Sequence, residues 1–135
     1  MSRVYLDTCL VIDLIEGEPE DQSLLRHALK GKWVVGSELV RMEARIKALK
    51  DDRRDFLNRY TIFFHHCEMV ALDRAVFERA TDLRVRHRIK TPDALHLATA
   101  LQASCNEFWS NDRGLLNAAN GQIKIVDWNS LRNPS

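Results

Sequence analysis

The sequence predicts an α/β fold with a central, mainly parallel sheet of about five strands flanked by helices. Five short apolar segments alternate along the chain with longer segments in which apolar residues recur at helical spacing. Only 5 glycines and 3 prolines occur in 135 residues, so the chain carries little of the turn chemistry that an all-β fold needs. Strands separated by helices typically form a parallel sheet covered on both faces.

The expected strands are residues 4–6, 33–35, 69–72, 107–109 and 123–126. The helical spacing between the second and third strands is carried by Leu39, Met42, Ile46 and Leu49, and then by Phe56, Leu57 and Tyr60. After the third strand, Val76, Ala80 and Leu83 line one face of a helix. A further helix begins at Thr91-Pro92-Asp93, where Thr91 is the expected N-cap and Pro92 the first helical residue. A short helix over 113–119 precedes the last strand.

Composition and charge indicate a single soluble domain, residues 1–135. A chain of this length buries roughly two thirds of its unfolded surface, enough for one core. Three cysteines without a C-x-x-C pair disfavour a disulfide framework or a zinc knuckle. A net charge of +1 excludes a strongly basic nucleic-acid coat protein. Since no apolar segment approaches the roughly 18 residues of a membrane helix and no signal region is visible, we expect a cytoplasmic protein.

Four acidic residues are expected at the carboxyl edge of the sheet, where open parallel sheets bind ligands. Asp7 and Asp112 follow the first and fourth strands, Glu43 lies on the helix after the second, and Asp93 begins the helix before the fourth. They converge if the first, second and fourth strands are neighbours. Clustered carboxylates without His or Cys suit a hard cation such as Mg²⁺ or Mn²⁺. Taken singly, each acid is more typical of a helix cap or a solvated loop.

The acids stand in four short segments spread over residues 4–113. The segments are Val4-Tyr5-Leu6-Asp7-Thr8, Ser37-Glu38-Leu39-Val40 running to Glu43, Thr91-Pro92-Asp93-Ala94-Leu95-His96-Leu97-Ala98-Thr99-Ala100, and Trp109-Ser110-Asn111-Asp112-Arg113. In this order they resemble the motif blocks of PIN-domain ribonucleases, and at this length they most resemble VapC-type toxins of type II toxin-antitoxin systems. The resemblance implies a PIN-like three-layer fold.

The same resemblance implies a Mg²⁺-dependent endoribonuclease, with Mn²⁺ as a substitute cation. Asp7, Glu43, Asp93 and Asp112, here called the acidic quartet, would be both the catalytic and the metal-binding residues. An activated water would attack phosphorus in line and the 3′ oxygen would leave, giving a 5′-phosphate product. RNA is the implied substrate, and a cognate antitoxin and a second copy of the chain are the implied partners.

Several other residues are assigned roles around the acidic quartet. The resemblance implies supporting hydrogen bonds from the hydroxyls of Thr8 and Ser37 and from the amide of Asn111. Cys9 stands where this motif commonly carries Asn, which leaves open the hydrogen bond that an amide would make there. His96 is expected to be packed or hydrogen-bonded rather than a metal ligand. Asp13, Asp73 and Asp127 are expected to be a surface acid, a helix cap and an acid away from the metal.

Two other kinds of function fit an acid after the first strand. A phosphatase of the haloacid dehalogenase type needs a second Asp two positions after Asp7, where Cys9 stands, and a receiver domain needs a Lys after the last strand, where Asp127 stands. Both are therefore disfavoured. A non-catalytic PIN-like module that binds RNA or a partner protein without cutting remains the alternative, and the complete acidic quartet favours the enzyme over it.

Overall fold

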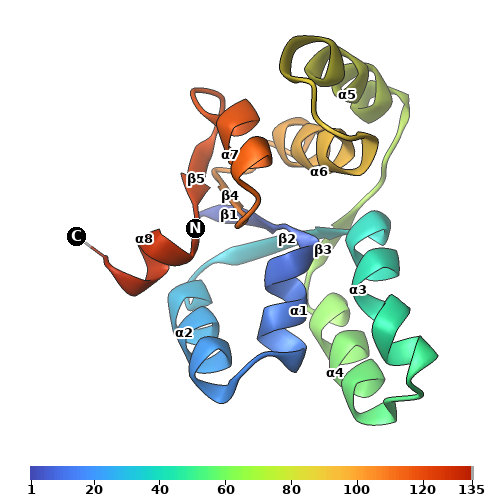
Figure 1. The fold of residues 1–135 in the computed structure, drawn as a ribbon, viewed down its shortest axis with the longest axis vertical. Helices are drawn as coiled ribbons and strands as arrows, with labels where there is room; N and C mark the ends of the chain where they lie inside the picture. Colours follow the sequence, from blue (N-terminus) through green and yellow to red (C-terminus); the bar gives the residue numbers. More distant parts are fainter. Residues whose placement is uncertain (135) are drawn as a thin grey trace.

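In the computed structural model, which describes residues 1–134, a five-stranded sheet lies between two layers of helices (Figure 1). The strands are β1 Arg3–Leu6, β2 Trp33–Ser37, β3 Glu68–Val70, β4 Glu107–Trp109 and β5 Lys124–Val126. Their spatial order is β3-β2-β1-β4-β5, and every neighbouring pair is parallel. The predicted α/β fold with five parallel strands is therefore confirmed, and β1 lies between β2 and β4 as the convergence of the acids requires.

The helices change face where the direction of winding changes. Helices α1 Thr8–Glu16, α2 Pro19–Leu29, α3 Glu38–Lys50 and α4 Arg54–His65 lie on one side of the sheet, and α5 Arg74–His87, α6 Thr91–Gln102 and α7 Arg113–Ala119 lie on the other (Figure 1). The last helix, α8 Trp128–Arg132, packs beside α2. Because parallel crossovers are right-handed, a chain that winds first towards β3 and then towards β5 must switch faces between β1 and β4. None of the helices within residues 1–134 has the length and apolarity needed to cross a bilayer.

The register of the central strands fixes where the polypeptide leaves the sheet at the end of each strand. Leu6 pairs with Trp109, and the backbone N–H of Asp7 donates a 2.9 Å hydrogen bond to the carbonyl of Trp109. Tyr5 is fully buried between its partners on β2 and β4 and stacks on Phe108 at 5.7 Å. The residues that follow β1 and β4 therefore emerge side by side at the carboxyl edge.

Helix α3 buries a different face from the one that its largest apolar residues suggest. Met42, Ile46 and Leu49 are 46–54% exposed, whereas the buried residues of α3 are Val40, Ala44 and Ala48. The buried residues recur every four positions and are small, so they allow α3 to pack closely on α1 and α4. The apolar spacing thus identified the helix correctly but did not identify its core face.

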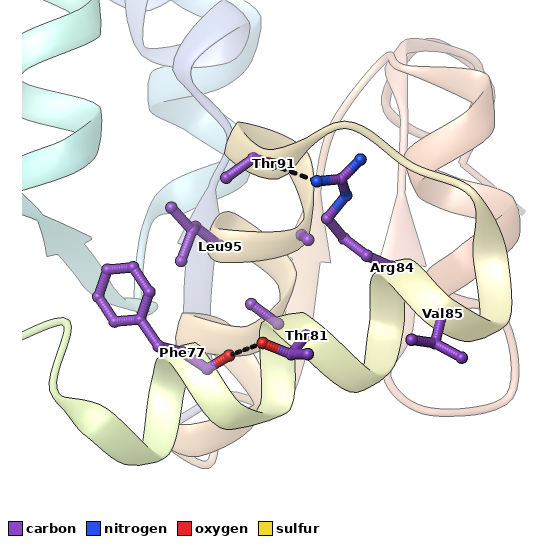
Figure 2. A pocket seen from close by; sticks show the side chains of 8 residues that line it. Phe77, Thr81, Arg84, Val85, Thr91 and Leu95 are labelled. Atoms are coloured by element: carbon purple, nitrogen blue, oxygen red, sulfur yellow. Dashed lines mark hydrogen bonds between the residues drawn. The ribbon is translucent and has the colours of Figure 1, made fainter.

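The start of α6 differs in one detail from the predicted cap. Lys90, not Thr91, is the N-cap, and it makes no side-chain capping bond. The helix therefore begins one residue earlier than predicted, and Pro92 is its second residue rather than its first. The Thr91 hydroxyl instead accepts a 2.9 Å hydrogen bond from Arg84 near the end of α5 (Figure 2). Arg84 also donates to the carbonyl of Ile89. Arg84 thereby joins the end of α5 to the start of α6, beside an open hollow of about 350 Å³ between the two helices. This contact fixes the turn that carries Asp93.

Candidate active site

Asp7 and Ser110 join the ends of β1 and β4 at the point where the chain changes face. Ser110 Oγ donates a 2.7 Å hydrogen bond to Asp7 Oδ2 and accepts one of 3.0 Å from the backbone N–H of Asp112. Ser110 is fully buried and Asp7 is 7% exposed. Open α/β sheets bind ligands in the crevice at such a switch point, so this edge is the candidate active site.

Two acids of the quartet also cap helices. Asp7 is the N-cap of α1 and accepts a 2.8 Å hydrogen bond from the backbone N–H of Thr8. Asp112 is the N-cap of α7 and accepts one of 3.0 Å from Leu115. The interpretation of these two acids as helix caps is therefore correct. It does not compete with a binding role, because an ionised carboxylate has about four acceptor positions and each cap uses one.

Glu43 is held by two donors from two other helices. The hydroxyl of Thr8 on α1 and Nε2 of His96 on α6 both lie 2.7 Å from Glu43 Oε1. The His96 hydrogen bond lowers the pKa of Glu43 below its usual value, with a smaller contribution from Thr8 and with burial acting in the opposite direction. Glu43 is therefore a carboxylate at neutral pH. The same nitrogen of His96, Nε2, also lies 3.9 Å from Asp7 Oδ1.

Asp93 is half-buried in the first turn of α6, and the other acids affect its pKa. Burial raises its pKa most, and the negative charges of Asp112 and Asp7 raise it further, while His96 acts in the opposite direction. This influence of Asp112 and Asp7 on Asp93 is what the sequence-based expectation of acids at one edge of the sheet predicts. Nevertheless, among residues 1–134 no three His, Cys, Asp or Glu side chains converge closely enough to form a ready-made metal cage.

The supporting residues named from the sequence lie at different distances from the acids. Thr8 contacts Glu43 directly. Ser37 caps α3 through the N–H of Val40 and reaches Glu43 only through other side chains. The side-chain oxygen of Asn111 accepts a 2.9 Å hydrogen bond from the backbone of Trp128, so in this structure Asn111 fastens α8 rather than touching an acid.

Cys9 supplies a thiol where the motif commonly has an amide. Its Sγ lies 3.8 Å from Asp7 Oδ2 as a weak donor. Burial, followed by the charge of Asp7, raises the pKa of the Cys9 thiol to about 11, so it stays protonated and keeps its hydrogen. The position therefore still presents a donor towards Asp7, although a weaker one than an amide.

Other acids have structural contacts. Asp73 and Asp127 cap α5 and α8 through Val76 and Ser130. Asp13 is half-buried rather than a plain surface acid, and it accepts a 3.3 Å hydrogen bond from the indole of Trp128. Asp73 and Asp127 therefore serve as helix caps, and Asp13 helps to hold α8 in place.

Sequence reasoning missed the roles of Tyr5 and Ser110 and the partner of His96. His96 is hydrogen-bonded, as expected, but its partner is a member of the acidic quartet. The available signal was spacing: His96 is three residues after Asp93 on one helix face, and Tyr5 is two residues before Asp7 on one strand face. Spacing alone does not reveal which residue lies across the sheet.

Comparison with known proteins places this architecture in a family. The family model of the PIN domain matches residues 4–121. The chain belongs to the PIN domain family. This PIN domain is 31% identical over 100 residues to ribonuclease VapC46 of Mycobacterium tuberculosis. The matched segment covers 74% of this chain and 75% of that protein.

Solved structures share the fold of this PIN domain. The toxin-antitoxin complex from Klebsiella pneumoniae aligns with a TM-score of 0.71 at 24% identity, covering 91% of this chain and 95% of that one. VapBC-1 from nontypeable Haemophilus influenzae aligns with a TM-score of 0.75 at 12% identity, covering 94% and 98%. The predicted PIN-like three-layer fold is therefore confirmed.

Proposed function

We propose that this PIN domain is a metal-dependent endoribonuclease that hydrolyses RNA phosphodiester bonds and is the toxin of a toxin-antitoxin pair. The observation that carries the proposal is the acidic edge itself, where burial and then the charges of Asp112 and Asp7 raise the pKa of Asp93. The similarity to ribonuclease VapC46 supports RNA as the substrate. The likeness of fold to a toxin-antitoxin complex agrees with an antitoxin partner.

Mg²⁺, with Mn²⁺ as a substitute, is the cation whose chemistry fits these residues. The available donors are carboxylate oxygens, which hard cations prefer. The raised pKa of Asp93 reflects burial and repulsion that a bound cation would offset. Because Mg²⁺ takes one or two carboxylates and keeps several waters, a cage of three protein ligands is not required. The ion would activate water and neutralise charge at the phosphate.

Each acid brings a different property to this proposed chemistry. Asp7, Asp93 and Asp112 would hold the cation, directly or through its bound waters. Asp7 is the most firmly held of the three because Ser110 and the α1 cap fix its carboxylate. Glu43 is ionised, so it would complete the site or accept a hydrogen bond from the attacking water. Asp112 is exposed at the rim, where the RNA backbone would approach.

We propose two protein partners, a cognate antitoxin and a second copy of this chain, both in the cytoplasm. Exposed apolar side chains support a protein-binding surface: Met42, Ile46 and Leu49 on α3, and Phe77 and Val85 on α5, both drawn in Figure 2. Exposed apolar patches typically mark interaction sites. A homodimer should be detected by light scattering, and Ile46→Glu should weaken it if α3 takes part.

A non-catalytic RNA-binding or protein-interaction module is the second candidate. The observation that favours it is the lack of three converging metal ligands within residues 1–134. Such a module would bind RNA without metal-dependent breakage, so the two functions differ in the integrity of the RNA.

Sequencing of RNA 5′ ends after expression of the chain in bacterial cells tests the proposed function. The wild type should produce new 5′-phosphate ends at defined positions. Asp93→Asn should abolish them, whereas Asp73→Asn, which changes a cap on α5, should retain them. A profile of RNA ends that is the same for the wild type and Asp93→Asn would contradict the nuclease and favour the module.

A further inference from the structure

A buried chain of hydrogen bonds ends on Glu43. Ser37 Oγ lies 3.0 Å from the Tyr5 hydroxyl, and that hydroxyl lies 2.8 Å from His96 Nδ1. His96 Nε2 then lies 2.7 Å from Glu43 Oε1. Ser37 and Tyr5 are fully buried and His96 is 2% exposed, so solvent does not replace these partners. This chain of hydrogen bonds connects the ends of β1 and β2 with α6 and α3.

The proton positions in this chain are constrained by its two ends. Glu43 Oε1 accepts a hydrogen bond from the Thr8 hydroxyl, and with this oxygen as the acceptor the hydrogen of the 2.7 Å His96–Glu43 bond belongs to Nε2. At the other end, Ser37 Oγ accepts from the N–H of Val40 at 3.2 Å, and either hydroxyl can be the donor of the Ser37–Tyr5 bond. In the tautomer with hydrogen on Nε2 alone, Tyr5 donates to Nδ1 and Ser37 donates to Tyr5. The hydrogen bonds of that tautomer run in one direction, from Ser37 to Glu43.

The two oxygens of Glu43 are used unequally. Thr8 and His96 both contact Oε1. Within residues 1–134, Oε2 has no hydrogen-bond partner, and the side chain of Glu43 is 25% exposed. One oxygen is therefore anchored from two sides while the other remains available at the acidic edge.

We propose that His96 is a positioning residue for the metal site: its Nε2–H anchors Oε1 of Glu43 and thereby reserves Oε2 for the cation. Tyr5 and Ser37 hold the imidazole in the orientation that makes this possible. The inference rests on the metal-dependent function proposed above. Partners that orient a metal-ligating side chain typically change metal affinity by about 10- to 100-fold when they are lost.

Two substitutions of His96 separate its two contacts. Asn places its polar atoms near the position of Nδ1, so His96→Asn keeps a partner for the buried Tyr5 hydroxyl and loses the bond to Glu43. Gln reaches the position of Nε2, so His96→Gln restores a donor to Glu43. Far-UV circular dichroism and the melting temperature of each metal-free variant establish that it is folded.

Mn²⁺ affinity, measured by electron paramagnetic resonance titration without RNA, tests the role of His96. His96→Asn should weaken Mn²⁺ binding by about 10- to 100-fold, and His96→Gln should recover most of the loss. In a Glu43→Gln background, His96→Asn should cause little further loss, because its effect passes through Glu43. Unchanged Mn²⁺ affinity in His96→Asn, or an equal loss in both backgrounds, would overturn the inference.

A measurement on the wild type does not depend on how the variants fold. Long-range ¹H–¹⁵N correlation spectra should show hydrogen on Nε2 of His96, and an unprotonated Nε2 would overturn the inference. If the wild type binds no Mn²⁺, the proposed metal dependence fails and the role of His96 fails with it. If the wild type binds Mn²⁺ and His96→Asn binds it equally well, only the role of His96 fails.

Discussion

Ser110 Oγ donates a 2.7 Å hydrogen bond to Asp7 Oδ2, and this buried contact joins two residues that are 103 positions apart in the sequence. It joins the residue after β1 to the residue after β4, where the helices change from one face of the sheet to the other. The same Ser110 oxygen accepts the N–H of Asp112. One hydroxyl therefore fixes the relative positions of two acids of the quartet.

Ser110→Ala should destabilise the protein by about 1–3 kcal/mol, because it leaves a buried Asp7 oxygen and the N–H of Asp112 without this partner. Ser23→Ala is the matched control, since Ser23 is exposed on α2 and its substitution should change stability by less than about 0.5 kcal/mol. Urea unfolding measures both. Equal effects of the two substitutions would show that the Ser110 contact does not hold the switch point together.

Asp93→Asn should make the metal-free protein more stable at pH 7. Burial and the charges of Asp112 and Asp7 raise the pKa of Asp93, so its ionised form is disfavoured in the folded state. Protonated Asp93 favours the folded state, and this contribution to stability is fully present below 3.8, the pKa of Asp93 in the unfolded chain. The contribution is lost as pH rises through the higher pKa of Asp93 in the folded protein. Asn avoids that loss.

The melting temperature in chelator measures this effect, with Asp73→Asn as a control that also removes one negative charge. Asp73 is an exposed N-cap of α5, and Asn is an equally good cap, so its melting temperature should stay close to that of the wild type. The prediction for Asp93 fails if its substitution lowers the melting temperature.

The ionised form of Glu43 should stabilise the folded protein, whereas the ionised form of Asp93 destabilises it, so Glu43→Gln should alter the pH dependence of stability in the opposite direction to Asp93→Asn. The hydrogen bond from His96 lowers the pKa of Glu43, so its contribution to stability is present above the unfolded value of 4.5 and is lost as pH falls through the lower folded value. The stability difference between wild type and Glu43→Gln should therefore shrink on acidification. Urea unfolding in chelator between about pH 3 and 7 measures it.

Glu78→Gln is the control for the Glu43 experiment, because Glu78 is exposed on α5. Its difference from the wild type should show little change with pH. If Glu43→Gln and Glu78→Gln gave parallel profiles, the His96–Glu43 hydrogen bond would contribute no pH-dependent stability.

The antitoxin proposal predicts a stable complex with the protein encoded beside this chain. Size-exclusion chromatography of the co-expressed pair should give one peak that contains both chains, and the complex should cleave RNA more slowly than the free PIN domain. Separate elution would contradict the toxin assignment while leaving the nuclease assignment intact.

The sheet and the positions of the acids were predictable because both depend on local patterns. The strand segments are short and apolar, and Asp7 and Asp112 follow strands directly, so parallel pairing alone brings them to one edge. The start of α6 near Pro92 was also readable from local chemistry, although the cap residue was not, because the Thr91 hydroxyl takes a hydrogen bond from Arg84 on another helix.

What the sequence did not reveal depends on contacts between distant elements. The core face of α3 is set by how closely Ala44 and Ala48 allow it to approach its neighbours, not by the larger Met42 and Ile46. Likewise, His96 was expected to make a hydrogen bond, but Glu43 lies 53 positions away in the sequence. Partner identity of this kind follows from the order β2-β1-β4, which no local pattern specifies.

Cleavage of total cellular RNA by the purified protein, with Mg²⁺ or with chelator, is the decisive test of whether the acidic quartet forms a metal-dependent nuclease site. Total RNA is the substrate because an enzyme selective for one structured RNA would leave a single test RNA intact. Wild-type protein with Mg²⁺ should generate discrete 5′-phosphate ends, chelator should prevent them, and Asp93→Asn should slow their formation by about 100-fold or more, with Asp127→Asn as the active control. Cleavage that persists in chelator or in Asp93→Asn, or RNA binding without any cleavage, would show that the acidic quartet is not a metal-dependent nuclease site.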